Sequence, residues 1–301
     1  MQHLTLGLDW TPNVNHIGFF VARDLGYYGE HGLEVEILDP SADNYATTPA
    51  KRVELGTADF ALCPTESIIS YRTKSTPADL VAIAGLLRQD VSALVIKADS
   101  GIASPRDLDG KTYGTYQARY EDAIVQQMVV NDGGRGDILP RRPDKLAMWN
   151  AFRAGDIDAT WVFLNWEGVQ QETSEVAVRY FKMHDYDVPY SYSPVIAVRR
   201  DRMAEQREAY RDFLAATRRG YLYCQAQPEE AVSILSKYVA ERDRDIDLSR
   251  ALELTAPHFG TPETWGRLEP EVLQPFLDWL HERELESADL TMEELATNEL
   301  L

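Results

Sequence analysis

The chain has 301 residues, 44% of them hydrophobic and 26% charged, a composition typical of a globular protein rather than a disordered or fibrous one. No apolar run approaches the roughly 20 residues that a membrane-spanning helix needs, and a chain of this length predicts two domains. Acidic residues number 49 against 30 basic ones, for a net charge of −19. Because such a field repels phosphate backbones and anionic membranes, nucleic-acid binding is disfavoured.

The first hundred residues alternate predicted strands with predicted helices. Gly26 and Gly56 are expected to end two of the helices. Strands alternating with helices predict an α/β protein with an open, mainly parallel sheet. The expected strands are 4–8, 33–38, 60–62, 81–87 and 93–96, and the expected helices are 17–25, 48–55 and 65–72.

A polar, turn-rich stretch at 97–101 predicts a first crossing into a second domain, and the strand at 194–198 a second crossing back. We therefore predict a discontinuous first domain of residues 1–97 and 198–301, and an inserted second domain of residues 98–197. Between the crossings we expect a short helix capped by Ser104, strands at 111–114 and 159–163, and helices at 120–130 and 146–153. After them we expect helices at 206–225, 228–238, 248–257 and 270–284.

The run from Asp9 to His16 lies between the first predicted strand and the first predicted helix. It combines a flat aromatic ring, two amides and an imidazole, which are groups that can hold a planar, hydrogen-bonding heterocycle. We expect the heterocycle to stack on Trp10 and its edge to pair with Asn13, Asn15 or His16. The alternative is a structural loop in which Asp9 or Asn15 caps the helix and Trp10 packs in the core.

Other candidates lie at similar strand-to-helix corners, beyond the carboxyl ends of strands, where ligands of open α/β sheets bind. Asn44 and Tyr45 follow the second strand, and Glu66 follows the third. Glu66 either complements the dipole of its helix or accepts a hydrogen bond from an exocyclic amine. The second domain is expected to close on the other face of the ligand through Tyr116, Trp161, Asn165, Glu167, Tyr190 and Tyr192.

Residues 114–117 lead into a predicted helix, and their backbone N–H groups are able to cradle an anion. Glu121 and Asp122 follow in the same helix. These acids make a strongly anionic ligand less attractive.

Patterns of known catalytic sites are absent from the sequence, which has no Gly-x-Ser-x-Gly, Walker, His-Glu-x-x-His or post-strand Gly-x-Gly-x-x-Gly motif. Cys63 and Cys224 are too few and too far apart to suggest a zinc cage, and we expect two buried thiols. We therefore predict no catalytic residue, no metal and no cofactor.

Three segments near the N-terminus stand out: LDWTPNVNHIGFFVA at 8–22, LGYYGEHGLEVEI at 25–37 and KRVELGTADF at 51–60. They resemble the superfamily that joins thiamin-pyrimidine synthases to the substrate-binding proteins of ABC transporters. The resemblance covers most of the chain to about residue 240 and implies the two-lobed type II periplasmic-binding-protein fold with a ligand cleft between the lobes. Matches to the branch that binds formyl-aminomethylpyrimidine are Asp9, Trp10, Pro12, Asn13, His16, Asp43-Asn44 and Asp132-Gly133-Gly134.

The synthase branch of this superfamily uses a Lys that carries pyridoxal phosphate, an active-site His and a Cys-rich motif associated with iron. In this sequence Cys63 and Ser67 stand at the positions expected for the Lys and the His, and residues 190–194 (YSYSP) replace the Cys-rich motif. Without the Lys no Schiff base holds the cofactor. The resemblance therefore implies a binding protein rather than an enzyme.

The predicted function is capture of a pyrimidine precursor of thiamin, of the formyl-aminomethylpyrimidine type, for uptake by an ABC transporter. Two alternatives stay open: a cytoplasmic protein of thiamin-pyrimidine biosynthesis or salvage, and a riboflavin-binding protein that uses the same aromatic residues. The expected partners are the small heterocycle and a transporter permease, with no nucleic acid, and we expect a monomer. The N-terminus lacks the pattern of a secretory signal, so the location is extracytoplasmic if a leader was removed and cytoplasmic if Met1 is native.

Overall fold

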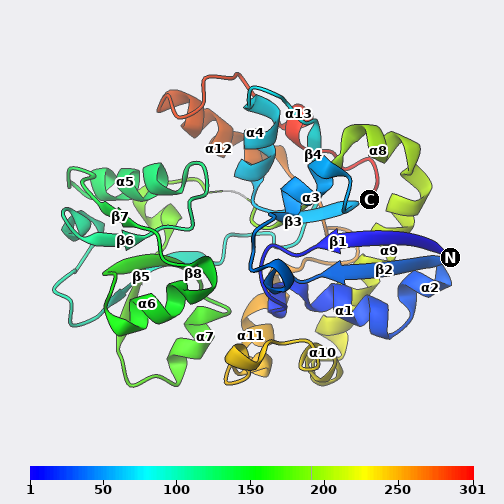
Figure 1. The fold of residues 1–301 in the computed structure, drawn as a ribbon, viewed down its shortest axis with the longest axis horizontal. Coiled ribbons are helices and arrows are strands. Elements are labelled where there is room, and N and C mark those ends of the chain that lie inside the picture. The colour runs from blue at the N-terminus through cyan, green and yellow to red at the C-terminus, as the bar shows by residue number, and fades with distance from the viewer. Residues whose placement is uncertain (191) are drawn as a thin grey trace. The chain divides into compact units, whose positions relative to one another are not determined.

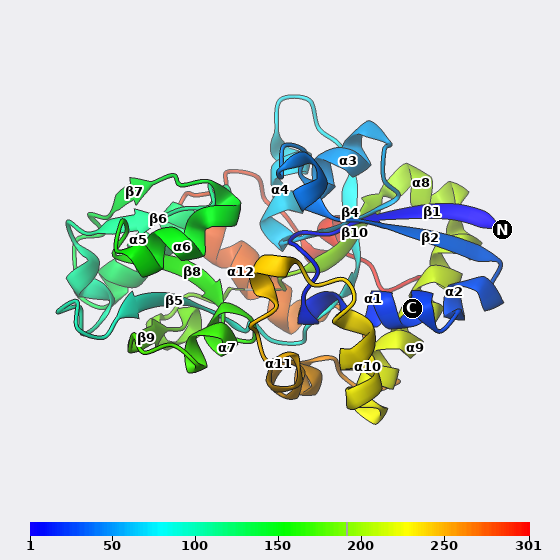
Figure 2. The ribbon, with the colours of Figure 1, turned by 60° about the horizontal axis from the view of Figure 1, so that its bottom comes forward.

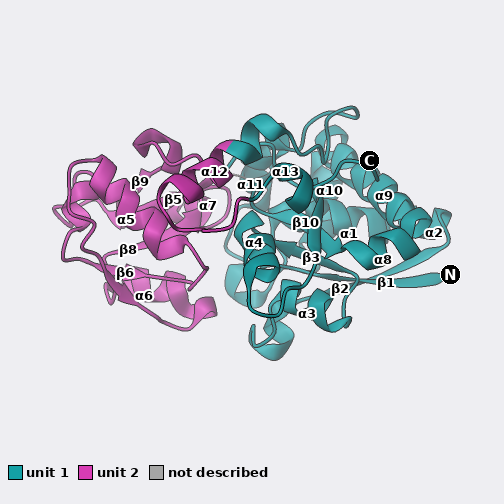
Figure 3. Cartoon of the chain, turned by 90° about the horizontal axis from the view of Figure 1, so that it is seen from above, with its two compact units in different colours: residues 1–90, 191–274, 290–301 teal, residues 91–190, 275–289 magenta. Residues whose placement is uncertain are grey.

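The computed structural model describes residues 1–190 and 192–301. The chain divides into two compact units, coloured separately in Figure 3. Unit 1 comprises residues 1–90, 191–274 and 290–301, and unit 2 comprises residues 91–190 and 275–289. Among the described residues, no helix combines the length and apolar character needed to cross a bilayer.

Unit 1 is built on a five-stranded sheet with the order β2-β1-β3-β10-β4. β1 runs parallel to β2 and β3, whereas β10 runs antiparallel to β3 and β4. β2 alternates buried Leu33 and Val35 with exposed Glu34 and Glu36, as a strand with one face on the core does. The strands are β1 (Gln2–Gly7), β2 (Leu33–Leu38), β3 (Phe60–Cys63), β4 (Leu80–Gly85) and β10 (Val195–Arg199).

Helices cover both faces of this sheet. Figures 1 and 2 place α3 on one face and α1 with α9 on the other. The helices of unit 1 are α1 (Ile17–Asp24), α2 (Tyr27–Glu30), α3 (Pro49–Leu55), α4 (Thr65–Thr73), α8 (Arg200–Glu205), α9 (Arg207–Ala226), α10 (Pro228–Leu235), α11 (Leu248–Thr255) and α13 (Met292–Leu295). Short 3₁₀ turns are η1 (Val14–His16), η2 (Pro40–Asp43), η6 (Glu241–Asp243) and η7 (Ala256–His258).

Stacked aromatic rings join the sheet of unit 1 to α9. The Phe213 ring of α9 lies 3.9 Å from the Phe60 ring of β3 and 5.5 Å from the Tyr28 ring of α2, centroid to centroid. All three side chains are buried. Each ring of this kind removes a large apolar area from water, so this stack is a main source of unit 1 stability.

Unit 2 is built on a second five-stranded sheet, with the order β7-β6-β8-β5-β9. β6 runs parallel to β7 and β8, and β5 runs antiparallel to β8 and β9. The strands are β5 (Ser92–Lys97), β6 (Thr112–Gly114), β7 (Leu139–Arg141), β8 (Ala159–Phe163) and β9 (Val178–Phe181). The helices are α5 (Glu121–Asn131), α6 (Met148–Ala154) and α7 (Glu167–Glu172). The 3₁₀ turns are η3 (Pro105–Leu108), η4 (Lys145–Ala147) and η5 (Met183–Tyr186). A further helix, α12 (Pro270–Glu282), has its first five residues in unit 1 and the rest in unit 2.

The α/β class is confirmed, and each sheet is mixed, with four strands in one direction and one strand antiparallel to them. The antiparallel strands are β5 and β10. Each is the strand by which the chain enters one unit from the other, because β4 of unit 1 leads to β5 of unit 2, and β9 of unit 2 leads to β10 of unit 1. The crossover rule that favours parallel neighbours concerns consecutive strands of one sheet, so it does not set the direction of these two strands.

Smaller differences concern short elements. Ser104 caps a 3₁₀ turn rather than an α-helix, and the edge strand β7 was not expected because its three residues are exposed and contain Pro140. Both cysteines are free and buried, as expected.

Residues 275–289 fall within unit 2, whereas the sequence prediction put all of 198–301 in the first domain. The buried Glu286 carboxylate accepts a hydrogen bond from the Tyr120 hydroxyl at 2.7 Å and forms an ion pair with Arg119 at 2.7 Å. The Phe276 ring lies 5.6 Å from the Tyr190 ring. These contacts join distant parts of the sequence and leave no local signal in it.

The contact between α1 and α9 depends on two glycines. A Cβ atom on Gly18 would lie 2.2 Å from the Tyr221 ring, and a Cβ atom on Gly220 would lie 2.1 Å from the Gly18 carbonyl oxygen. The Tyr221 ring is itself fixed, because its hydroxyl donates to the Asn15 carbonyl at 2.6 Å. Only residues without a side chain allow the helices this approach.

We predict that Gly18→Ala lowers the free energy of unfolding by about 1–3 kcal/mol, because the added methyl overpacks a fixed ring. Urea unfolding measures this loss. The matched control is Gly29→Ala in α2, where a Cβ atom meets nothing within 4 Å, and it should be neutral or stabilising by up to about 1 kcal/mol. A Gly18→Ala protein as stable as the control would contradict the packing described.

Candidate functional site

Two loops meet at the carboxyl edge of the unit 1 sheet. β1 and β3 are parallel neighbours, with Gly7 opposite Ala61. The loop 9–16 follows β1, and the corner from Cys63 to Glu66 follows β3. This edge brings together most of the unit 1 residues that the sequence singled out.

The loop 9–16 is closed by its own hydrogen bonds. The Asn13 side-chain oxygen accepts from the Asn15 backbone N–H at 2.8 Å, and its amide nitrogen donates to the Thr11 carbonyl at 3.1 Å. Asn13 thereby caps η1, and it is buried, as are Asn15 and His16. The sequence predicted a polar side chain of this loop as a cap, but the residue differs. Asn13, rather than Asp9 or Asn15, caps the turn η1.

Both ring nitrogens of His16 are engaged inside the same loop. Nδ1 accepts from the Asn13 backbone N–H at 3.3 Å, and Nε2 lies 2.7 Å from a carboxylate oxygen of Asp9. Because Nδ1 accepts, Nε2 carries the proton and donates to Asp9. The His16 side chain is 1% exposed and that of Asp9 18%. The imidazole therefore positions Asp9 and the loop.

Distant segments anchor this loop from outside. The Tyr221 hydroxyl of α9 donates to the Asn15 carbonyl. The Thr11 hydroxyl donates to Asp243 at 3.4 Å and accepts from Arg242 at the same distance. These partners lie more than 200 residues away in sequence, so sequence reasoning did not find them.

Trp10 and Tyr45 form an aromatic pair beside the loop. Their ring centroids are 6.0 Å apart with an interplanar angle of 54°, and both residues are half-buried. The Tyr45 hydroxyl donates to the Asp9 carbonyl, which ties the two segments together. Asn44, the other candidate after β2, is exposed.

Asn44 and Tyr45 both have left-handed backbones, with φ of 52° and 59°. A bulky residue such as Tyr rarely adopts this region, and the strain costs about 1–3 kcal/mol for each such residue. The Tyr45 backbone N–H donates to the Pro40 carbonyl at 2.8 Å, which helps to hold the conformation. Residues with strained backbones cluster at functional sites. Here the strained residue is Tyr45, whose ring lies next to Trp10.

The corner after β3 contributes buried acid and thiol groups. Glu66 lies in the first turn of α4 and is 3% exposed. Burial, with the nearby Asp9 and Glu66 charges, raises the pKa of the Cys63 thiol. A reactive cysteine needs a lowered pKa, so Cys63 lacks the character of a nucleophile.

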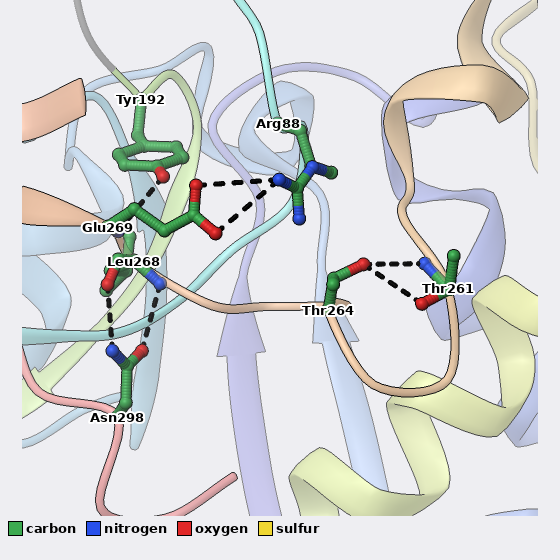
Figure 4. A network of polar contacts seen from close by, with 7 residues as sticks. All are labelled: Arg88, Tyr192, Thr261, Thr264, Leu268, Glu269 and Asn298. Carbon is green, nitrogen blue, oxygen red and sulfur yellow. Dashed lines mark hydrogen bonds and ion pairs between the residues drawn. The ribbon is translucent and has the colours of Figure 1, made fainter. Parts of the chain in front are cut away.

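Tyr192 belongs to unit 1, although the sequence placed it in the second domain. Figure 4 shows its hydroxyl accepting from the Glu269 backbone N–H, at 3.1 Å, with Arg88 beside the Glu269 carboxylate. Its carbonyl accepts from the Thr65 hydroxyl at 2.9 Å. The ring is buried, so these contacts give Tyr192 a structural role in joining the β3 corner to the segment before α12.

In unit 2, candidate residues gather at the carboxyl ends of β6 and β8, which run parallel. The Trp161 ring of β8 lies 5.0 Å from the Tyr190 ring with an interplanar angle of 64°, and both residues are half-buried. Asn165 is buried after β8, and Glu167 begins α7. A Glu167 carboxylate oxygen accepts from the Phe163 backbone N–H at 3.0 Å.

The corner at residues 114–118 does not offer free N–H groups to an anion, in contrast to one sequence expectation. The backbone N–H groups of Tyr116 and Ala118 donate to the two carboxylate oxygens of Glu121, at 3.0 and 3.1 Å. The Gln117 N–H donates to the Thr115 hydroxyl at 3.0 Å. Glu121 is the first residue of α5, and its side chain folds back over the turn that precedes the helix.

Two curated relatives and a family model match most of this chain. The family model described as NMT1/THI5 like matches residues 13–231. The formylaminopyrimidine-binding protein of Halalkalibacterium halodurans is 27% identical over 239 residues, which cover 78% of this chain and 70% of that protein. The 4-amino-5-hydroxymethyl-2-methylpyrimidine phosphate synthase of Legionella pneumophila is 26% identical over 237 residues, covering 78% and 73%.

Solved structures share the fold over the whole chain. The alkanesulfonate-binding protein SsuA from Xanthomonas axonopodis pv. citri, bound to MOPS, superposes with a TM-score of 0.73 at 12% identity. The match covers 99% of this chain and 98% of that one. At this identity the likeness concerns the fold, and it agrees with the type II periplasmic-binding-protein architecture expected from the sequence.

We predict that Asn13→Ala lowers the free energy of unfolding by about 1 kcal/mol, because the cap of η1 and the bond to Thr11 are both lost. Asn13→Asp keeps an oxygen that accepts from the Asn15 N–H and should lose less. Urea unfolding of the two variants gives the comparison. Equal stability of Asn13→Ala and the wild type would show that the loop does not depend on this side chain.

Proposed function

This chain belongs to the NMT1/THI5-like family, and on that premise we propose that it is a solute-binding protein for a pyrimidine precursor of thiamin, of the formylaminopyrimidine type. One relative at 27% identity is named for that ligand. The observation that carries the proposal is the Trp10 and Tyr45 pair, which a closed loop and a strained backbone hold at the carboxyl edge of the unit 1 sheet.

The chemistry of this edge suits an aminopyrimidine. The half-buried Trp10 ring offers a stacking surface to a flat heterocycle. The buried Glu66 carboxylate and the Asp9 carboxylate accept hydrogen bonds, which the exocyclic amine of an aminopyrimidine can donate. Binding would thus combine a stacked ring with a carboxylate that recognises the amine.

The unit 2 candidates are proposed to contact the same ligand. Trp161 and Tyr190 supply a second pair of half-buried aromatic rings, and Asn165 and Glu167 supply polar groups beside them. A ligand that contacts both units stabilises the conformation in which both sets of contacts are made. Ligand binding is commonly coupled to domain closure in this way.

The proposed place of action is outside the cytoplasmic membrane, with an ABC-transporter permease as the partner that receives the ligand. Whole-chain similarity to a binding protein of this architecture supports this role. In this proposal no bond is made or broken in the ligand.

A synthase activity is the second candidate, because one relative at 26% identity is named as a synthase. The pyridoxal phosphate that the synthase branch uses does not fit the residues present. Cys63, the last residue of β3, stands at the position expected for the cofactor Lys, and it is a buried thiol whose pKa is raised by burial. A thiol forms no stable imine with the cofactor, so we derive no synthase chemistry for this chain.

A ligand panel tests the proposal directly. Purified protein is titrated calorimetrically with formyl-aminomethylpyrimidine, hydroxymethylpyrimidine, thiamin, riboflavin and pyridoxal phosphate. We expect the formyl-aminomethylpyrimidine to bind most tightly. Tighter binding of riboflavin would identify the ligand as a flavin rather than a pyrimidine. An absorption band of an imine between the protein and pyridoxal phosphate would favour the synthase activity.

We predict that Trp10→Ala weakens pyrimidine binding by about 1–3 kcal/mol, the value of a lost ring stack, while the protein stays folded. The matched control is Tyr238→Ala, which removes a half-buried ring that stacks on Phe20 with the ring centroids 4.5 Å apart. The control should alter stability and leave affinity unchanged. Wild-type affinity in the Trp10→Ala protein would remove Trp10 from the site.

A further inference from the structure

Glu121 carries an inference about ligand charge that rests on the proposed function. We propose that Glu121 is a specificity-determining residue, an internal anion that fills the backbone N–H cradle of unit 2 and so restricts the ligand to uncharged or cationic heterocycles. Because Glu121 already occupies the backbone N–H groups, phosphorylated and sulfonated analogues of the ligand are excluded.

The geometry of the cradle is the first step. The backbone N–H groups of Tyr116 and Ala118 converge on one carboxylate, with one oxygen of Glu121 for each. The Tyr113 hydroxyl donates to the same carboxylate at 2.8 Å. Three donors of this kind, at the N-terminus of the 11-residue helix α5, are the groups by which proteins hold phosphate or sulfonate oxygens. Glu121 takes all three.

The Glu121 carboxylate is buried together with its donors, which stabilises these hydrogen bonds. Glu121 is 4% exposed, and Tyr113, which donates to it, is 1% exposed. An external anion would have to displace the carboxylate from its donors and leave that charge buried beside its own. Both steps are unfavourable.

A second buried acid accepts a backbone N–H at the neighbouring corner. At the end of β8, the Phe163 backbone N–H donates to Glu167, which is 9% exposed. Both acids act electrostatically on Tyr116, whose pKa is raised by burial first and then by Glu167 and Glu121. Two of the four strands whose carboxyl ends lie at this side of the unit 2 sheet, β6 and β8, are thus each followed by an acid that acts on a candidate ligand residue.

Lys145 is a cation near this group. Lys145 is half-buried near Glu121, and burial lowers its pKa. Glu121 and Glu167 place two acidic side chains at this corner, and the field of two carboxylates repels a further anion. An uncharged ligand with donor groups is compatible with that field, and a ligand with a phosphate is not.

The test compares hydroxymethylpyrimidine with hydroxymethylpyrimidine phosphate, which differ only in the charged group. The wild type should bind the phosphate at least about tenfold more weakly than the alcohol. In Glu121→Gln, which keeps the side-chain shape and removes the charge, the affinity ratio should narrow by about tenfold, mainly through tighter binding of the phosphate.

The matched control is Asp122→Asn, which removes a carboxylate from the same helical turn, whereas the Tyr116 and Ala118 N–H groups donate to Glu121. It should shift the ratio much less. A second arm titrates inorganic phosphate, at constant ionic strength, into wild-type and Glu121→Gln protein and follows thermal stability. Only the variant should be stabilised.

The outcomes separate the two proposals. If the wild type binds no pyrimidine, the proposed function fails, and the phosphate arm still decides the role of Glu121. If the wild type binds the pyrimidine alcohol and its phosphate equally, or if Glu121→Gln leaves both the ratio and the response to phosphate unchanged, the cradle does not determine specificity and this inference is overturned.

Discussion

The closed hydrogen-bond circuit of residues 9–16 is the constraint on which the unit 1 site depends. Asn13 caps η1 with its oxygen, its backbone N–H fixes the His16 tautomer, and His16 in turn holds the Asp9 carboxylate. The Asp9 carbonyl then accepts from Tyr45, which keeps that ring beside Trp10. Since these bonds are made within the protein, the aromatic pair is positioned before any ligand arrives, and the ordering cost of binding is reduced.

Both units carry acidic side chains at their candidate sites. Asp9 and Glu66 lie at the carboxyl edge of one sheet, and Glu121 and Glu167 at the carboxyl edge of the other. Helix N-termini at such edges attract anions in general, but here the protein supplies its own carboxylates. The fold is shared with an alkanesulfonate-binding protein, so the fold leaves ligand charge open, and side chains at these corners decide it.

Local patterns in the sequence predicted most elements, and long-range contacts account for what they missed. The alternation of Leu33 and Val35 with acids predicted β2, and the residues after β1 predicted a polar loop. The Tyr221 bond to Asn15 and the Thr11 bond to Asp243 join residues more than 200 positions apart, and no local pattern encodes them. Glu121 was recognised as an acid near an anion cradle, but only the structure reveals that its side chain turns back to fill it.

The most direct test of pyrimidine recognition is a crystal structure of the protein grown with formyl-aminomethylpyrimidine. We expect the pyrimidine ring to lie against Trp10, with its exocyclic amine within hydrogen-bond distance of Asp9 or Glu66. A ligand bound elsewhere, with the Trp10 and Tyr45 rings left uncovered, would contradict the assignment of this loop as the recognition site.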